Sequence, residues 1–206
     1  MSDRELFRVA GVALVGGGVC IALFVLVLYP VGGFFGAGHA EHSLWVPAHG
    51  LHFIGALLTV FGLVGLYGYR RHALGAAGLV GFTLALAGTA QFVGTGMLTT
   101  FVWPVLAASA PGTLDPQGAL FVSPANILFY TTVLTLIPGY VLLAFTMWRA
   151  NVFSRTACAL VGIGVVLAIT PPEPVGPVPW LGLVLGGVVF GIGEAWWGVQ
   201  LAGSAA

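Results

Sequence analysis

Long apolar runs, separated by short polar or glycine- and proline-rich stretches, dominate the chain. Within these runs apolar positions do not alternate with polar ones, so the pattern indicates helices and disfavours the strands of a membrane barrel. A helix that crosses the hydrocarbon core of a bilayer needs about 20 apolar residues. We therefore predict an all-α polytopic membrane helix bundle with one integral membrane domain, residues 1–206. Its six transmembrane helices are expected at about 7–29, 45–69, 73–102, 125–148, 155–170 and 179–200.

The composition strengthens the membrane interpretation. Of the 206 residues, 59% are hydrophobic and only 6% are charged, whereas soluble domains carry about 25% charged residues. The lipid bilayer is therefore the first expected partner. A nucleic-acid partner is not expected, because the chain has no basic stripe. Glycine is abundant, with 32 residues, and in membrane helices such small residues allow close helix packing.

The charged residues predict the orientation of the bundle. With six crossings, every arginine falls on one side of the membrane, and the acids of the connecting loops, Glu41, Asp115 and Glu173, fall on the other. The positive-inside rule then places both termini in the cytoplasm (N-in/C-in). We expect a multi-pass protein of the cell (cytoplasmic) membrane. The arginines are Arg4, Arg8, Arg70, Arg71, Arg149 and Arg155.

Four of the five histidines lie within residues 39–52. His49 and His52 are three positions apart and share one face of the second helix, with His42 earlier and Thr59 later on the same stripe. Because exposure of polar groups to lipid is costly, this stripe should face the bundle interior or a cavity.

Polar residues at a similar depth on the third and fourth helices are placed to meet this stripe. If the second helix packs between them, a pocket forms in the outer half of the membrane. A few converging polar groups within apolar walls are typical of a ligand-binding site. The predicted lining residues are His49, His52, Gln91, Thr95, Asn126 and Tyr130.

Four interpretations of the histidines stay open at this point. Imidazoles and a carboxylate suit a transition metal, although the spacing is not that of an HExxH motif. A haem held by His49 and Met97, which match in depth, is a second interpretation. Proton handling or transport is a third, and a structural role through hydrogen bonds to Gln91 or to backbone carbonyls is the fourth. The candidate metal ligands are His39, Glu41, His42, His49 and His52.

Two further residues interrupt the apolar spans. Glu194 lies about one turn from the paired tryptophans 196 and 197, so we expect it near the inner interface, either snorkelling or paired with an arginine, and too far from the histidines to join them. Pro138 removes one backbone hydrogen bond from the fourth helix. With Gly139 it is a candidate kink or, in a transporter, a candidate hinge.

The run Ala48–Leu58 (AHGLHFIGALL), followed by Gly62–Tyr67 (GLVGLY), resembles a pattern in a family of small six-helix prokaryotic membrane proteins of uncharacterised function. The later order of a long helix, an outer loop, a proline-rich connector and a final helix with paired tryptophans is also similar, so the resemblance covers about residues 45–200. It implies the topology and a recurrent histidine on the second helix, and it implies no activity.

These patterns predict a protein that binds a small ligand, a metal or a redox cofactor in the outer-half pocket. A small transporter or proton-handling protein hinged at Pro138–Gly139 is one alternative. An accessory subunit of a larger membrane complex is another, and a homo-oligomer is open as well. The sequence has no nucleophile with a partnered base, no phosphate loop and no Rossmann glycine pattern. Any enzymatic activity would therefore depend on the histidines.

Overall fold

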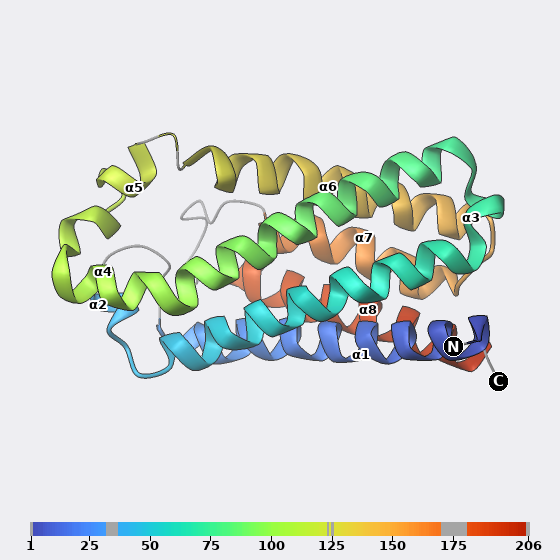
Figure 1. The fold of residues 1–206 in the computed structure, drawn as a ribbon, viewed down its shortest axis with the longest axis horizontal. Helices are drawn as coiled ribbons and strands as arrows, with labels where there is room; N and C mark the ends of the chain where they lie inside the picture. Colours follow the sequence, from blue (N-terminus) through green and yellow to red (C-terminus); the bar gives the residue numbers. More distant parts are fainter. Residues whose placement is uncertain (1, 32–36, 123, 125, 170–180, 205–206) are drawn as a thin grey trace.

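Five long helices run side by side along the length of the molecule (Figure 1). The structure, a computed structural model, describes residues 2–31, 37–122, 124, 126–169 and 181–204. Every regular element in these ranges is helical, which confirms the predicted all-α class. The long helices are α1 (Asp3–Leu28), α3 (Trp45–Met97), α6 (Asn126–Arg149), α7 (Arg155–Ile169) and α8 (Leu181–Ser204). The shorter segments are α2 (Ala37–Ala40), α4 (Trp103–Ser109), α5 (Ala119–Val122), two 3₁₀ turns (Tyr29–Val31 and Pro111–Leu114) and a π-helical turn (Leu98–Val102).

Helix α3 is folded back on itself. Its 53 residues would span about 80 Å as a straight helix, but the backbone leaves helical geometry at Arg70 (φ −138°, ψ 24°) and at Gly75 (φ 62°, ψ −164°). The Gly75 conformation is one that only glycine adopts readily. The chain reverses there, so α3 consists of a first arm (residues 45–69) and a second arm (residues 76–97) (Figure 1).

The helices form a closed ring in the order α8, α1, first arm of α3, second arm of α3, α6, α7 and back to α8. Glycines bring neighbouring backbones together, most clearly between the antiparallel helices α1 and α8. Gly11 faces Gly198, and two turns further on Gly18 faces Gly191. A Cβ added to Gly11 would lie only 2.6 Å from the carbonyl oxygen of Gly198. These glycines allow the close approach expected of small residues in membrane helices.

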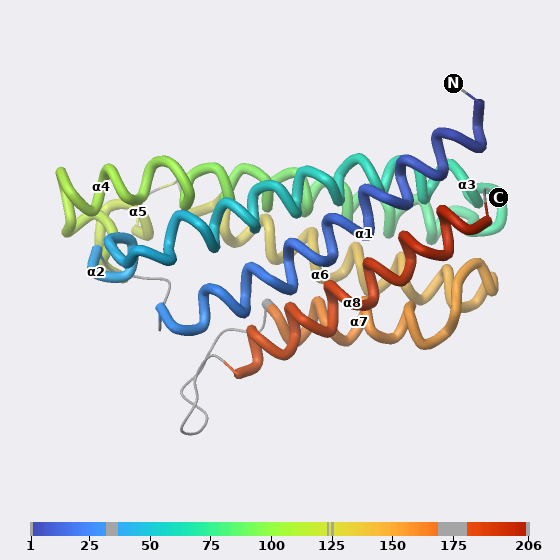
Figure 2. Tube along the Cα trace, turned by 90° about the horizontal axis from the view of Figure 1, so that it is seen from below, coloured from blue at the N-terminus to red at the C-terminus, as the bar shows by residue number. Residues whose placement is uncertain are grey.

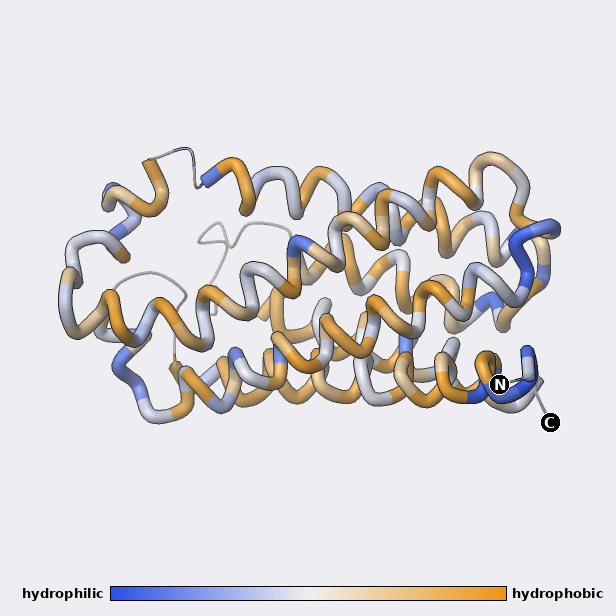
Figure 3. Tube along the Cα trace, in the orientation of Figure 1, coloured by the Kyte–Doolittle hydropathy of each residue, from blue (hydrophilic) through white to orange (hydrophobic). Residues whose placement is uncertain are grey.

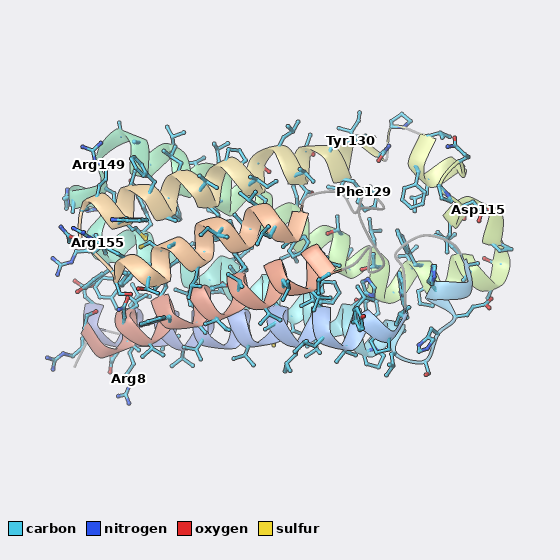
Figure 4. The ribbon with its side chains drawn as sticks, turned by 180° about the vertical axis from the view of Figure 1, so that it is seen from behind. Arg8, Asp115, Phe129, Tyr130, Arg149 and Arg155 are labelled. Carbon is cyan, nitrogen blue, oxygen red and sulfur yellow. The ribbon has the colours of Figure 1, made fainter. Side chains whose placement is uncertain are left out.

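The two ends of the bundle differ in charge. Both termini, the Arg70–Gly75 reversal and the α6–α7 turn lie at one end, which we call the arginine end (Figures 1 and 2). Arg8, Arg149 and Arg155 lie at this end, and Asp115 lies at the opposite end with α2, α4 and α5 (Figure 4). We call this opposite end the α4 end. Hydrophilic positions gather mostly at the two ends and hydrophobic ones along the shaft (Figure 3).

In the part of the chain that the structure describes, four helical stretches are long and apolar enough to cross a membrane, which confirms the coarser prediction of a membrane protein. They are Asp3–Val31, Trp45–Ser109, Asn126–Arg149 and Leu181–Ser204. Helix α7 is apolar but shorter. The predicted proline-rich connector at residues 170–179 lies outside the described residues.

Apolar side chains fill the arginine half of the ring. They come from α1, both arms of α3, α6, α7 and α8. The most completely buried of them include Leu14, Leu63, Leu66, Leu143, Met147, Trp197 and Leu201. A second apolar cluster, which includes Phe24, Trp45, Trp103 and Leu114, packs in the α4 half.

A π-helical turn joins the second arm of α3 to α4. The π-helical winding of this turn differs from that of the α-helices on either side. Within the turn, the Thr99 carbonyl accepts a hydrogen bond from the Trp45 indole Nε1–H at 2.7 Å. Trp45 also stacks on Trp103, with ring centroids 5.5 Å apart. The turn therefore ties the start of α3 to α4 across 54 residues of sequence.

Candidate functional site

The α4 half of the ring contains a partly open cavity of about 690 Å³. It extends from Trp103 and Phe121 at the α4 end to Thr59 and Tyr140, deeper in the bundle. Its walls come from α1, both arms of α3, α4, α5, α6, α7 and α8, because the ring brings all of these elements around one axis. Most of the wall is apolar or aromatic, with a small number of hydroxyl, amide and imidazole groups. Such a lining is typical of a pocket for a small molecule.

His49 and His52 lie on the cavity wall, as their spacing predicts, and both are buried. The His49 Nδ1–H donates to the Trp45 carbonyl at 3.0 Å, which fixes the hydrogen on that nitrogen because a carbonyl cannot donate. The His49 ring also stacks on the Trp45 indole, with centroids 4.0 Å apart. The backbone bond and the stacking together hold His49 in one orientation.

His52 is held by aromatic rings on both sides. Its ring centroid lies 4.9 Å from that of Phe24 on α1 and 3.9 Å from that of Phe92 on the second arm of α3. Neither ring nitrogen makes a hydrogen bond of ordinary geometry with a described residue, and the Phe92 backbone is the hydrogen-bonding group that lies near the ring. A buried imidazole in this state retains a donor and an acceptor that a ligand can use.

The metal interpretation finds no support in the described ranges, where no group of three or more histidine, cysteine or acidic side chains is placed to hold a metal ion. The rings of His49 and His52 are 6.3 Å apart. His42 does not extend their stripe, because α3 begins only at Trp45. Its Nδ1 instead accepts the backbone N–H of Leu44 at 3.1 Å, on the surface. His39 on α2 and the exposed Glu41 also lie before α3 begins.

The haem pairing of His49 with Met97 is corrected by the structure. Met97 is 49% exposed on the outside of the bundle, whereas His49 faces its interior. Gln91 is partly buried and does not line the cavity. Its Oε1 has no hydrogen-bond partner among the described residues, so the predicted bond between Gln91 and the histidines is not formed.

The other predicted lining residues reach the cavity. Thr95 lies on its wall, and its hydroxyl donates to the Phe92 carbonyl at 2.9 Å. Asn126, at the start of α6, lines the α4 end of the cavity and donates through its side-chain amide to the Phe121 carbonyl. Tyr130 lies at the rim and is 64% exposed (Figure 4). Five of the six predicted residues therefore meet around one cavity, with Gln91 as the exception.

Sequence reasoning missed a set of threonines on the cavity wall. Thr99 donates to the Thr95 carbonyl at 2.9 Å, and Thr132 donates to the Leu128 carbonyl at 2.7 Å. Because each hydroxyl gives its hydrogen to its own helix, the side that faces the cavity presents oxygen lone pairs. The signal in the sequence is a series of threonines three to six positions apart in apolar helices, which is weak without knowledge of the neighbouring helices.

Glu194 does not lie where the sequence suggested. Its side chain is 0% exposed within the bundle, and among the described residues no arginine pairs with it. The six arginines are all exposed, and those labelled in Figure 4 lie at the arginine end. Trp197 is likewise 0% exposed, so its indole lies in the core of the bundle beside the same helix face as Glu194.

Pro138 lies inside α6, which continues through it. The next residue, Gly139, packs directly against the second arm of α3, where an added Cβ would lie 2.7 Å from the Ala85 Cα. A hinge at this point would have to break that contact.

Comparison with known protein families, with curated proteins and with solved structures finds no match to this chain. The interpretation of the site therefore depends on its own geometry.

Proposed function

We infer that the chain crosses the membrane six times with both termini in the cytoplasm. The reversal at Arg70–Gly75 makes two antiparallel crossings of α3, and α7 supplies the sixth element that closes the ring. Its 15 residues span about 22 Å, less than the ~30 Å of a typical hydrocarbon core, so the bilayer thins locally around it. The gathering of arginines at one end supports a cytoplasmic position for that end.

Within this topology the cavity occupies the outer half of the membrane, and we propose that it binds a small, mostly apolar molecule. The observation that carries this proposal is the cavity volume of about 690 Å³, which is within the ~300–1,000 Å³ of ordinary ligand pockets. The arginine half of the same ring is packed with apolar side chains. The cavity is therefore a local feature of the α4 half and does not reflect loose packing throughout.

The polar groups of the wall define the chemistry of the ligand. Thr95, Thr99 and Thr132 donate their hydroxyl hydrogens to their own helices and offer lone pairs to the cavity. His52 offers one donor and one acceptor. The complementary ligand has an apolar body that packs on Phe24, Phe92 and the neighbouring aromatic rings, and it bears at least one O–H or N–H donor.

Native mass spectrometry of the protein, purified in mild detergent, tests this proposal. We expect a small-molecule adduct on the wild-type protein. The adduct should be lost in Thr132→Phe, because the larger aromatic side chain projects into the cavity and obstructs the ligand. The matched control is Thr131→Phe, because Thr131 directly precedes Thr132 on α6 and does not line the cavity. An adduct retained equally by both variants, or no adduct other than detergent, refutes the proposal.

An absorption spectrum and elemental analysis of the same samples test the cofactor alternatives. A Soret band or a near-stoichiometric metal that disappears in His52→Ala would replace the apolar-ligand proposal with a cofactor site. A colourless, metal-free protein that carries an organic adduct supports the proposal as stated.

A further inference from the structure

Glu194 lies near the middle of the bundle, just below the cavity. It is 13 residues from the start of α8 and 10 from its end, or about 20 Å and 15 Å along the helix. Gly17 on α1 makes room for it: a Cβ on Gly17 would lie 2.5 Å from the Thr59 Oγ1 and 3.3 Å from a Glu194 carboxyl oxygen. Thr59 and Tyr140, which line the deep end of the cavity, are its polar neighbours.

The hydroxyl groups around Glu194 give their hydrogens to other acceptors. The Thr59 hydroxyl donates to the Gly55 carbonyl at 2.9 Å. Thr89 donates to the Ala85 carbonyl at 2.7 Å, so in the 3.0 Å contact between Thr89 and Tyr140 it is the tyrosine that donates. Each of these hydroxyls carries one hydrogen. Toward Glu194, both Thr59 and Tyr140 therefore present only lone pairs.

Within the described ranges, the titratable groups that lie nearest to Glu194 on the surrounding elements do not supply a positive charge. They are Cys20 on α1, His52 on α3, Tyr140 on α6 and Cys158 on α7. Three of these are acids, and His52 lies two helical turns from Thr59, about 10 Å along α3. Both Glu194 oxygens lack a hydrogen-bond partner of ordinary geometry among the described residues. An ionised carboxylate surrounded by lone pairs and apolar groups is unfavourable, whereas a carboxylic acid supplies the missing donor.

We propose that Glu194 is a proton-binding site in the middle of the membrane. Its carboxylic acid O–H donates a hydrogen bond to the Thr59 hydroxyl oxygen, and its proton exchanges with water through the cavity. The apolar core, with Leu63, Leu143 and Trp197, separates the site from the arginine end. Thr59 and Tyr140 connect it with the cavity. The proposal rests on the outer-half cavity proposed above, and it makes that cavity a route for protons as well as a ligand pocket.

Infrared spectroscopy of the purified protein in a lipid film tests the bound proton directly, because the carbonyl stretch of a carboxylic acid is separate from the bands of a carboxylate. At neutral pH we expect an acid band that is lost in Glu194→Gln and retained in Glu41→Gln, a control at an exposed acid. In Thr59→Val the band should shift to higher frequency because the acceptor is lost, and in Thr59→Ser it should stay in place. Circular dichroism verifies that each variant is folded, and the Thr59 pair keeps the test valid if Glu194→Gln does not fold.

The exchange route is tested by the rate at which the same band shifts after transfer to D₂O. Ala56 lines the cavity one turn before Thr59, so Ala56→Leu should slow exchange several-fold, while Ala87→Leu, on an exposed face of the second arm, should leave it unchanged. No band that depends on Glu194, or a band that is abolished by sodium ions, would overturn the proton assignment. Equal exchange rates in the two alanine variants would overturn the route. Neither measurement needs the ligand, so failure of ligand binding is a separate outcome.

Discussion

Replacing Gly18 with alanine tests whether the first and last helices close the ring through their glycines. Gly18 faces Gly191 across the contact between α1 and α8. An added Cβ would lie 2.8 Å from the Ala195 amide nitrogen and closer still to the Gly191 carbonyl oxygen. Ordinary contacts of a Cβ begin at 3.4 Å, so the two helices must separate by at least 0.6 Å (3.4 − 2.8).

A gap of that size costs free energy because dispersion attraction falls steeply with distance. A separation of about 0.5–1 Å forfeits a quarter to a half of the attraction between the affected atoms, and overpacking in close-packed interiors costs about 1–3 kcal/mol. The higher helix propensity of alanine returns up to about 1 kcal/mol. With the full return from helix propensity, we therefore expect Gly18→Ala to lower the free energy of unfolding by up to about 2 kcal/mol.

The assay is unfolding in mixed micelles with increasing SDS, followed by far-ultraviolet circular dichroism. Gly94→Ala is the matched control, because a Cβ at Gly94 meets nothing within 4 Å. The control should be neutral or should stabilise the protein by up to about 1 kcal/mol. Equal free energies of unfolding for the two variants would show that the contact between α1 and α8 does not depend on glycine.

Two further predictions concern the α4 end and the topology. Trp45→Phe removes the indole N–H that donates to the buried Thr99 carbonyl. Because that carbonyl is then left without its partner, we expect the free energy of unfolding to fall by about 1–3 kcal/mol in the same assay. A decrease below about 0.5 kcal/mol would mean that another donor replaces the indole. In a cysteine-free background, Asp115→Cys should react with a membrane-impermeant thiol reagent in intact cells, whereas Ser2→Cys should react only after permeabilisation. The reverse labelling pattern would contradict the inferred orientation.

The helices and much of the cavity lining follow from the sequence because both depend on local spacing. Apolar runs of sufficient length form helices in lipid whatever their neighbours are. The interval of three between His49 and His52 fixes their common face. Thr95 and Asn126 are placed at a matching depth by counting residues from the helix ends.

Other features depend on which helices are neighbours, and a single sequence does not encode that in a readable pattern. The position of Glu194 illustrates this. Its depth was judged from Trp197, but that indole is turned into the core, and α8 continues to Ser204. The space for the carboxyl is made by Gly17, 177 positions earlier in the chain. Only knowledge that α1 lies beside α8 could have connected the two residues.

The pairing of α1 with α8 also has a consequence for biosynthesis. Since α8 packs between α1 and α7, these two helices must remain in the bilayer without one of their neighbours until α8 has been synthesised and inserted. The helix that completes the assembly is also the one that carries Glu194. An ionised acid at the centre of a helix raises the free energy of insertion by about 2.5–3.5 kcal/mol, and a protonated one avoids most of that cost. A ribosome that stops before α8 would therefore leave a laterally open bundle, a ready substrate for the proteases that remove unfinished membrane proteins.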